Sequence, residues 1–452
     1  MLLNRVEELK LLKNLYLEKK PKLLIVYGRR RVGKTALLTE FSKNHKILYL
    51  MSRQESVKDQ LTKMSSEIAD YLGDNMLKIN PLQNYDALFS YLHSKKISFV
   101  FDEFPFLVES NKALPSILQE YWDKHFSRAD SLIILCGSSV RMMESLLGYK
   151  SPLYGRRTEQ ILIEPLKFKD ACLFFPKLSP EEKIKTYAIL GGTPAYLLEF
   201  DYSLKLIENI KENILMKNKF LYQDVDFVLK EELNEPRTYY SIVKSVSNGN
   251  TKIGNIMNDT GYDKGKVTKY LSVLRSIHII ERVVPITETN PEKSRNGVYL
   301  LKDNYFKFWF RFVFQNEEYI EQGKKEKLII EKIEPGLNSF TGVAFEEISR
   351  DWVKEQKKFN NYLIGKWWDK EEEIDIVGVD KHNNKLLVGE VKWSSLSGKE
   401  VLGEFEKLKQ KSEKIMWGDK PTKEFIIIAK EIKGKKDLIS KGNYVFDLED
   451  IV

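Results

Sequence analysis

The sequence has little cysteine and little histidine. Its 452 residues include 2 cysteines and 5 histidines. Two cysteines in a chain of this length exclude a disulfide framework and a cysteine-based zinc site. Cys136 lies in an apolar run and Cys172 in an amphipathic stretch, so both are expected to be small buried apolar residues. The histidines are not spaced as metal ligands; they are His45, His93, His125, His278 and His382. A zinc enzyme is therefore not expected.

The sequence also lacks a long apolar run. No stretch approaches the about 20 apolar residues that a membrane helix needs. Residues 1–20 are charged every few positions and contain no signal-peptide core. With 42% apolar and 31% charged residues, the chain can bury a core, and its length predicts two to four domains. We expect a cytoplasmic protein without a membrane partner.

Positive charge is concentrated in the middle of the chain. Residues 236–311 contain 13 Lys and Arg against 6 Asp and Glu, a balance of +7, whereas residues 325–452 contain 24 against 25, a balance of −1. The whole chain has a formal charge of +8. A basic segment suits an anionic partner such as DNA, although it does not establish one.

The first part of the chain alternates apolar strands with amphipathic helices. Strands are predicted at residues 22–27, 47–51, 97–101, 132–136 and 160–163, with helices between them. This alternation predicts an α/β fold with a parallel sheet covered by helices. After residue 165 the pattern becomes helical up to about residue 232.

A phosphate-binding loop is predicted at residues 28–35, GRRRVGKT, between a strand and a helix. The glycines let backbone N–H groups turn inward, and the helix N-terminus adds partial positive charge. Lys34 would reach the β- and γ-phosphates of ATP, and Thr35 would coordinate Mg²⁺. The residues expected around the nucleotide are Gly28, Arg31, Val32, Gly33, Lys34, Thr35 and Ala36.

Two further strand ends would complete this site. The strand at residues 97–101 is followed by Asp102 and Glu103. Asp102 would bind Mg²⁺ through water, and Glu103 would polarise the attacking water. The next strand is followed by Ser138, whose hydroxyl could sense the γ-phosphate; a plain Ser/Gly turn is the alternative.

These segments, with YGRR at residues 154–157 and GGTP at 191–194, together resemble the archaeal-type ATPases related to the AAA+ and STAND classes. NRVEEL at residues 4–9 also resembles that family's N-terminal box. The resemblance implies that Arg156 or Arg157 lies near the γ-phosphate, in the same chain or across a subunit boundary, so an oligomer is possible. It also implies that residues 191–194 belong to a helical lid.

Residues 236–301 are predicted to form a winged helix: helices, then two strands around a loop. Asp263 can cap its second long helix. The polar side of that helix and the wing tip carry basic residues suited to DNA phosphates: Lys264, Lys266, Lys269, Arg275, Lys293 and Arg295. The alternative is a lid or packing module.

The C-terminal part resembles the PD-(D/E)xK nuclease fold, an α/β restriction-endonuclease-like domain. Strands are predicted at residues 373–379, 385–392 and 425–429, and a helix at 341–356. The resemblance implies that Asp375 and Glu390 hold Mg²⁺, that Lys392 orients or deprotonates water, and that Glu346 completes the site. Ile374 stands where the family usually has proline. The alternative is a nuclease-like fold without activity.

The sequence thus predicts four regions: an ATPase core at residues 1–165, a helical lid at 166–232, a winged helix at 233–320 and a nuclease-like domain at 321–452. We predict an ATPase that uses ATP and Mg²⁺ and couples nucleotide state to DNA binding and cleavage. Its catalytic residues would be Glu103, Arg156, Glu346, Asp375, Glu390 and Lys392. The alternative is a STAND-like nucleotide-gated regulator, or a DNA-binding switch, whose C-terminal domain is not catalytic.

Overall fold

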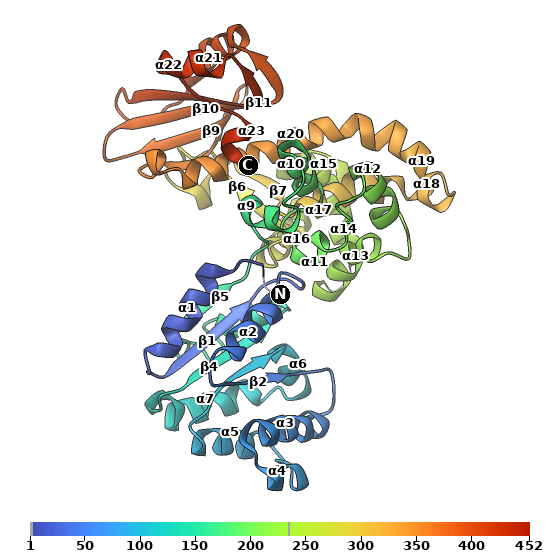
Figure 1. Cartoon of the computed structure of the whole chain (residues 1–452), viewed down its shortest axis with the longest axis vertical. Helices are drawn as coiled ribbons and strands as arrows, with labels where there is room; N and C mark the ends of the chain where they lie inside the picture. The colour runs from blue at the N-terminus through green and yellow to red at the C-terminus, as the bar shows by residue number, and fades with distance from the viewer. Residues whose placement is uncertain (1–2, 234–235) are drawn as a thin grey trace. The chain divides into compact units, whose positions relative to one another are not determined.

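The computed structural model describes residues 3–233 and 236–452, and its chain divides into two compact units (Figure 1). Unit 1 extends to Leu166 and includes Thr193–Ala195. Unit 2 comprises Lys167–Gly192 and the chain from Tyr196 onward.

Unit 1 contains a parallel sheet of five strands within the described residues, in the order β2-β3-β4-β1-β5. This confirms the parallel sheet predicted from the sequence. The strands are β1 (Lys22–Tyr27), β2 (Ile47–Met51), β3 (Ser98–Asp102), β4 (Leu132–Gly137) and β5 (Glu159–Leu162).

Helices connect these strands and cover the sheet (Figure 1). In β1, Leu23 and Ile25 pack into one buried apolar cluster and Leu24 and Val26 into another, because side chains alternate along a strand. The sheet is therefore buried on both faces. The helices are α1 (Val6–Leu17), α2 (Lys34–Lys43), α3 (Val57–Leu72), α4 (Asn75–Ile79), α5 (Tyr85–Ser94), α6 (Phe104–Ser110), α7 (Leu114–Lys124) and α8 (Val140–Leu147).

Unit 2 begins with a helical region. It contains α9 (Phe168–Ala171), α10 (Pro180–Leu190), α11 (Pro194–Leu197, which straddles the boundary with unit 1), α12 (Leu206–Asn209) and α13 (Phe220–Glu232). Three more helices, α14 (Pro236–Ser247), α15 (Ile253–Thr260) and α16 (Lys264–Ser276), are followed by β6 (Ile280–Val283) and β7 (Val298–Leu301). These two strands pair antiparallel, and Asp263 caps α16 by accepting a hydrogen bond from the Lys266 N–H at 3.0 Å.

The aromatic segment after β7 is helical. It begins with α17 (Asn304–Phe308) and continues as a π-helical turn, Trp309–Val313. Short helices α18 (Glu317–Glu321) and α19 (Lys325–Leu328) lead into α20 (Glu334–Glu355). This last helix starts seven residues before the predicted start at 341 and directly continues a π-helical turn, Ile329–Ile333.

The C-terminal sheet is mixed and has the order β12-β11-β10-β9-β8 in the described chain. Helix α20 packs Phe345 and Ile348 against one face, and α21 packs Val401 and Phe405 against the other. The elements are β8 (Leu363–Trp368), β9 (Glu373–Asp380), β10 (Lys385–Ser397), α21 (Gly398–Ser412), β11 (Thr422–Lys433), α22 (Lys435–Ser440), β12 (Tyr444–Phe446) and α23 (Leu448–Ile451). The sequence analysis missed β8, which is half exposed, and β12, which has three residues.

Candidate functional sites

The loop at residues 28–35 joins β1 to α2 and requires glycine at its first position. Gly28 has a φ of 152°, and a Cβ there would lie 2.2 Å from the carbonyl oxygen of Ile163. Gly33 has a φ of 97° and precedes α2 without a side-chain cap, so the first N–H groups of the helix remain available to an anion. The backbone thus has the features of a phosphate cradle.

Lys34 lies inside this loop and is 4% exposed. Its ammonium donates hydrogen bonds to the carbonyl oxygens of Gly28 at 2.8 Å and Arg29 at 2.9 Å. Burial lowers the pKa of Lys34, while the Glu103 and Asp102 carboxylates work against that change. The two hydrogen bonds hold the ammonium where phosphate oxygens would approach the loop.

Asp102, at the end of β3, is fully buried and bonded to the loop. Its Oδ2 accepts a hydrogen bond from the Thr35 hydroxyl at 2.7 Å and another from the Tyr49 hydroxyl. Its Oδ1 accepts the Glu103 N–H at 3.0 Å. A hydroxyl and a carboxylate oxygen this close are the hard ligands that Mg²⁺ prefers, so these residues fit the ion.

Glu103 and Ser138 also meet, although β3 ends at Asp102 and β4 begins only at Leu132. The Ser138 hydroxyl donates to Glu103 Oε1 at 2.7 Å, and the Ser138 N–H donates to Oε2 at 3.2 Å. Glu103 has a φ of 54°. Ser138 thus holds the Glu103 carboxylate beside the phosphate loop, where this carboxylate could orient a water molecule.

The other residues predicted around the nucleotide lie in or next to the loop. Arg31 has a φ of 71°, Val32 is 1% exposed, and Ala36 lies in the first turn of α2. Arg5 adds a contact that the sequence did not reveal: its guanidinium donates to the carbonyl oxygens of Val32 at 2.8 Å and Glu164 at 2.6 Å. The segment before α1 is thereby tied to the loop.

The structure does not bring Arg156 to the phosphate loop of its own chain. Arg156 precedes β5, whose first residue pairs with Leu24 in β1, whereas the loop follows the opposite end of β1. Its guanidinium forms a bidentate ion pair with Asp123 at 3.0–3.2 Å, and Arg157 donates to the Leu147 carbonyl. Of the two placements implied by the resemblance, the one across a subunit boundary remains as a prediction.

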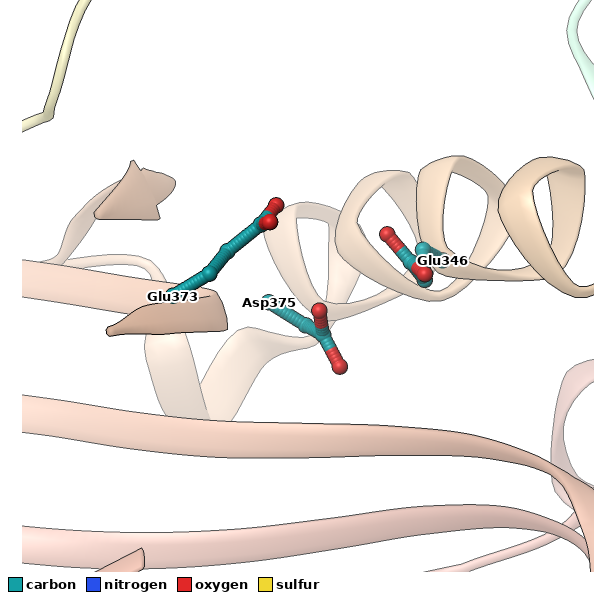
Figure 2. Close-up of side chains that lie close together, drawn as sticks. All are labelled: Glu346, Glu373 and Asp375. Carbon is teal, nitrogen blue, oxygen red and sulfur yellow. The ribbon is translucent and has the colours of Figure 1, made fainter. Parts of the chain in front are cut away.

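A second group of acidic residues lies in unit 2 (Figure 2). Glu346 comes from α20, and Glu373 and Asp375 come from β9; one carboxylate oxygen of each lies within 4.8 Å of the others. The Lys366 ammonium forms ion pairs with Glu346 at 2.9 Å and Glu373 at 2.6 Å. Lys366 was not predicted, because β8 was not recognised, whereas Glu373 lies on the predicted strand β9 but was not named as a site residue. We call Glu346, Glu373 and Asp375 the acidic cluster.

Asp375 connects the acidic cluster to Glu390. The antiparallel register of β9 and β10 pairs Ile376 with Gly389, which places Asp375 opposite Glu390. Asp375 Oδ2 accepts the Val391 N–H at 2.9 Å. Burial, reinforced by the charges of Glu346 and Glu390, raises the pKa of Asp375 to about 7. A divalent cation would relieve this crowding of negative charge, so the donor set fits Mg²⁺.

Lysines surround Glu390, which is 7% exposed. The Lys392 ammonium lies 2.6 Å from Glu390 Oε1, and the Lys411 ammonium lies 3.5 Å from Oε2. Burial opposes the change, but the contact with Glu390 raises the pKa of Lys392. The structure thus places Lys392 beside Glu390, and it adds Lys411, on α21, which the sequence pattern did not indicate.

The basic side of α16 is accessible. Lys264 and Lys269 are exposed, and Lys266 is half-buried, with its ammonium 3.9 Å from the centre of the Tyr262 ring.

In the described part of the chain, no helix is long and apolar enough to cross a membrane.

Two families match this chain. Residues 2–200 match a family described as an ATPase domain predominantly from Archaea, and residues 309–403 match archaeal and bacterial proteins of unknown function. The uncharacterized protein MJECL04 of Methanocaldococcus jannaschii is 34% identical over 457 residues, which covers 100% of both chains. The uncharacterized ATP-binding protein MJ0423 of the same organism is 53% identical over 47 residues, 10% of this chain and 80% of that protein.

A solved structure is also similar. The Walker-type ATPase of Pyrococcus abyssi aligns with a TM-score of 0.51 and 19% identity, covering 69% of this chain and 96% of that chain. At this identity the likeness concerns the fold.

Proposed function

The chain belongs to the family of the uncharacterized protein MJECL04, and its residues 2–200 match the archaeal ATPase-domain family, so we propose that it binds ATP with Mg²⁺ at residues 28–35 and hydrolyses the bond between the β- and γ-phosphates. The observation that carries this proposal is the contact of Thr35 with Asp102 at 2.7 Å, directly beside the buried Lys34. Asp102, at the end of β3, thereby supplies the carboxylate that a metal bound at the loop requires.

Each residue has a distinct task in this proposal. Lys34 and the loop N–H groups bind the phosphates, and Thr35 and Asp102 hold Mg²⁺, which would draw charge from the β- and γ-oxygens. Glu103 accepts hydrogen bonds from Ser138, which fixes its carboxylate. From that position Glu103 would orient a water molecule and accept its proton.

Phosphate release from ATP tests this assignment. We expect Glu103→Gln to keep nucleotide binding and to lose hydrolysis by at least about 100-fold, the lower range of general-base contributions. Glu109→Gln is the matched control, because Glu109 is exposed on α6. Equal hydrolysis by Glu103→Gln and the wild type would remove Glu103 from this role.

For unit 2 we propose a Mg²⁺-dependent phosphodiesterase acting on DNA. The support is the convergence of Glu346, Asp375 and Glu390, with Lys392 at 2.6 Å from Glu390. The acids would hold the ion, which stabilises charge on the scissile phosphate and lowers the pKa of bound water. Because its pKa is raised, Lys392 would orient water or phosphate as a cation and would not act as the base.

Cleavage of plasmid DNA and of circular single-stranded DNA, each with Mg²⁺ or Mn²⁺, tests this second proposal. Glu390→Ala should abolish cleavage, whereas Glu406→Ala, an exposed position on α21, should not. If purified wild type never cleaves DNA of any form, the alternative is the better account: a nucleotide-gated regulator, or a DNA-binding switch, whose C-terminal domain only binds.

A further inference from the structure

A cavity of about 720 Å³ lies within unit 2, apart from the phosphate loop. Its walls come from the end of α14, from β7, from residues 304–316, from α20 and from Lys366 of β8. This volume lies within the roughly 300–1,000 Å³ range of small-ligand pockets. The cavity is therefore large enough to hold a small organic ligand.

The lining carries an excess of positive charge. Five cations and two carboxylates line the cavity, which leaves a net charge of +3. The cations are Lys307, Arg311, Lys332, Arg350 and Lys366, and the carboxylates are Glu346 and Glu347.

Both carboxylates are already paired. Glu347 forms an ion pair with Lys307 at 2.6 Å, and Glu346 forms one with Lys366 at 2.9 Å. The net charge therefore belongs to the other three cations.

Those three cations have no carboxylate partner in the part of the chain that the structure describes. Arg350 donates to the backbone carbonyl of Asp375 at 3.1 Å, and Arg311 has a hydroxyl partner, Ser339, at 3.4 Å. Lys332 is exposed at the rim. Like charges gathered in a concave surface focus a positive potential, which attracts anions.

The chemistry of these groups favours phosphate. Arginine guanidinium groups bind phosphate oxygens through paired hydrogen bonds. The remaining walls are apolar or carry amides and hydroxyls, including Val343, Phe340, Asn248 and Thr251. Such walls suit the sugar and base of a nucleotide better than they suit a simple inorganic ion.

The cavity also reaches the acidic cluster. Glu346, which belongs to the cluster (Figure 2), also lines the cavity. Lys366 lines the cavity and forms an ion pair with Glu373. A duplex, whose major groove alone is about 12 Å wide, is too large to enter a cavity of this volume. A single strand can place its phosphates and unstacked bases separately.

We propose that this cavity binds a short single-stranded stretch of nucleic acid and leads one phosphodiester to the acidic cluster. The inference rests on the phosphodiesterase proposed above and names its substrate as single-stranded. Arg311, Lys332 and Arg350 bind the backbone phosphates, and the apolar wall contacts the bases.

Binding of a fluorescently labelled, 5′-phosphorylated trithymidylate, measured by anisotropy in EDTA, tests the inference without cleavage. Arg311→Glu combined with Lys332→Glu should weaken binding about ten-fold or more, because two phosphate contacts become repulsive. The matched control, Lys399→Glu with Lys409→Glu, makes the same charge change on exposed α21 residues and should bind like the wild type. Lys332→Glu alone alters only an exposed side chain and should show a partial loss, which excludes misfolding as the cause.

The other outcomes of these binding and cleavage measurements distinguish the possible ligands and activities. Equal affinity in the cavity variant and the control overturns the inference. Thymidine monophosphate that binds as tightly as the trinucleotide identifies a free nucleotide as the ligand, which also overturns the inference. Retained trinucleotide binding in a protein that cleaves no DNA keeps the cavity assignment and removes the phosphodiesterase. DNA cleavage by the wild type, together with unchanged trinucleotide binding in the cavity variant, keeps the phosphodiesterase and removes the cavity assignment.

Discussion

Lys34 provides the sharpest test of the nucleotide site because its ammonium is buried against the loop carbonyls. Replacing it with alanine removes a charged hydrogen-bond donor, worth about 1.5–3 kcal/mol. We expect Lys34→Ala to weaken ATP binding roughly 10- to 100-fold in a calorimetric titration. Lys43→Ala, at the exposed end of the same helix, is the control. Unchanged affinity in Lys34→Ala would refute the assignment.

Tyr49 is predicted to position the metal ligand, since its hydroxyl donates to the same Asp102 oxygen as Thr35 does. Burial and the neighbouring Asp102 charge raise the pKa of Tyr49, so the hydroxyl stays protonated and remains a donor. Tyr49→Phe should raise the Mg²⁺ concentration needed for half-maximal hydrolysis about five-fold, the effect of roughly 1 kcal/mol.

The control for Tyr49 is Tyr16→Phe, which removes a hydroxyl that donates to the Lys46 carbonyl at 3.4 Å. ATP binding without Mg²⁺ should be unchanged in both variants. A loss of metal-free binding in Tyr49→Phe would indicate a general packing role for this tyrosine.

Helix α16 is expected to supply most of the affinity for duplex DNA, because its segment has a balance of +7 and the C-terminal part is near neutral. Replacing Lys264, Lys266 and Lys269 with alanine should weaken duplex binding and reduce the slope of affinity against salt by up to about 3, since each phosphate contact releases counterions. The measurement is a salt series of binding isotherms.

A matched control for α16 replaces three exposed lysines of α21, namely Lys399, Lys407 and Lys409. If the α16 variant and this control bind duplex DNA equally well, the three-helix module is a packing element.

The acidic cluster should bind a divalent cation and thereby stabilise the C-terminal sheet. A ligand that binds the folded state at 100 times its Kd adds about 2.7 kcal/mol to the free energy of unfolding. We expect millimolar Mg²⁺ to raise the melting temperature of the wild type, and Asp375→Asn to reduce that increase. Asp419→Asn, in an exposed turn, should respond to Mg²⁺ like the wild type. An identical increase in all three proteins would place the ion elsewhere.

The sequence predicted elements better than the contacts between them. The strand ends at Asp102 and Ser138 could be found because an apolar run followed by polar residues is a local pattern. The role of Tyr49 could not be found, since it depends on β2 lying beside β3. Lys366 was missed for a related reason: β8 alternates weakly and is half exposed.

The position of Arg156 shows the same limit. The segment around Arg156 resembles a family whose arginine acts on phosphate. In the structure, Arg156 lies just before β5, at the edge of the parallel sheet opposite to the phosphate loop. Sheet register, which places both Arg156 and the Asp375–Glu390 pair, is set by long-range packing and not by local propensity.

The two units are predicted to communicate. Residues 191–194 contribute to both: Gly191 belongs to unit 2, whereas Pro194 belongs to unit 1 and lies 3.9 Å from where a Cβ on Gly33 would be. A non-hydrolysable ATP analogue should change the rate of DNA cleavage about five-fold or more, a typical coupling between sites. Lys34→Ala should abolish this response and keep the nucleotide-independent rate. A wild-type rate that ignores nucleotide would show that the units act separately.

The lysines beside the acidic residues also determine how the protein should be handled. Lys366 and Lys392 act as internal counter-ions for Glu346 and Glu390, so the folded state does not depend on a metal to balance these charges. Proteins whose fold needs zinc unfold when the ion is removed. This chain should instead survive purification and storage in a chelator with its C-terminal sheet intact, and dialysis into Mg²⁺ should restore its full response to the ion.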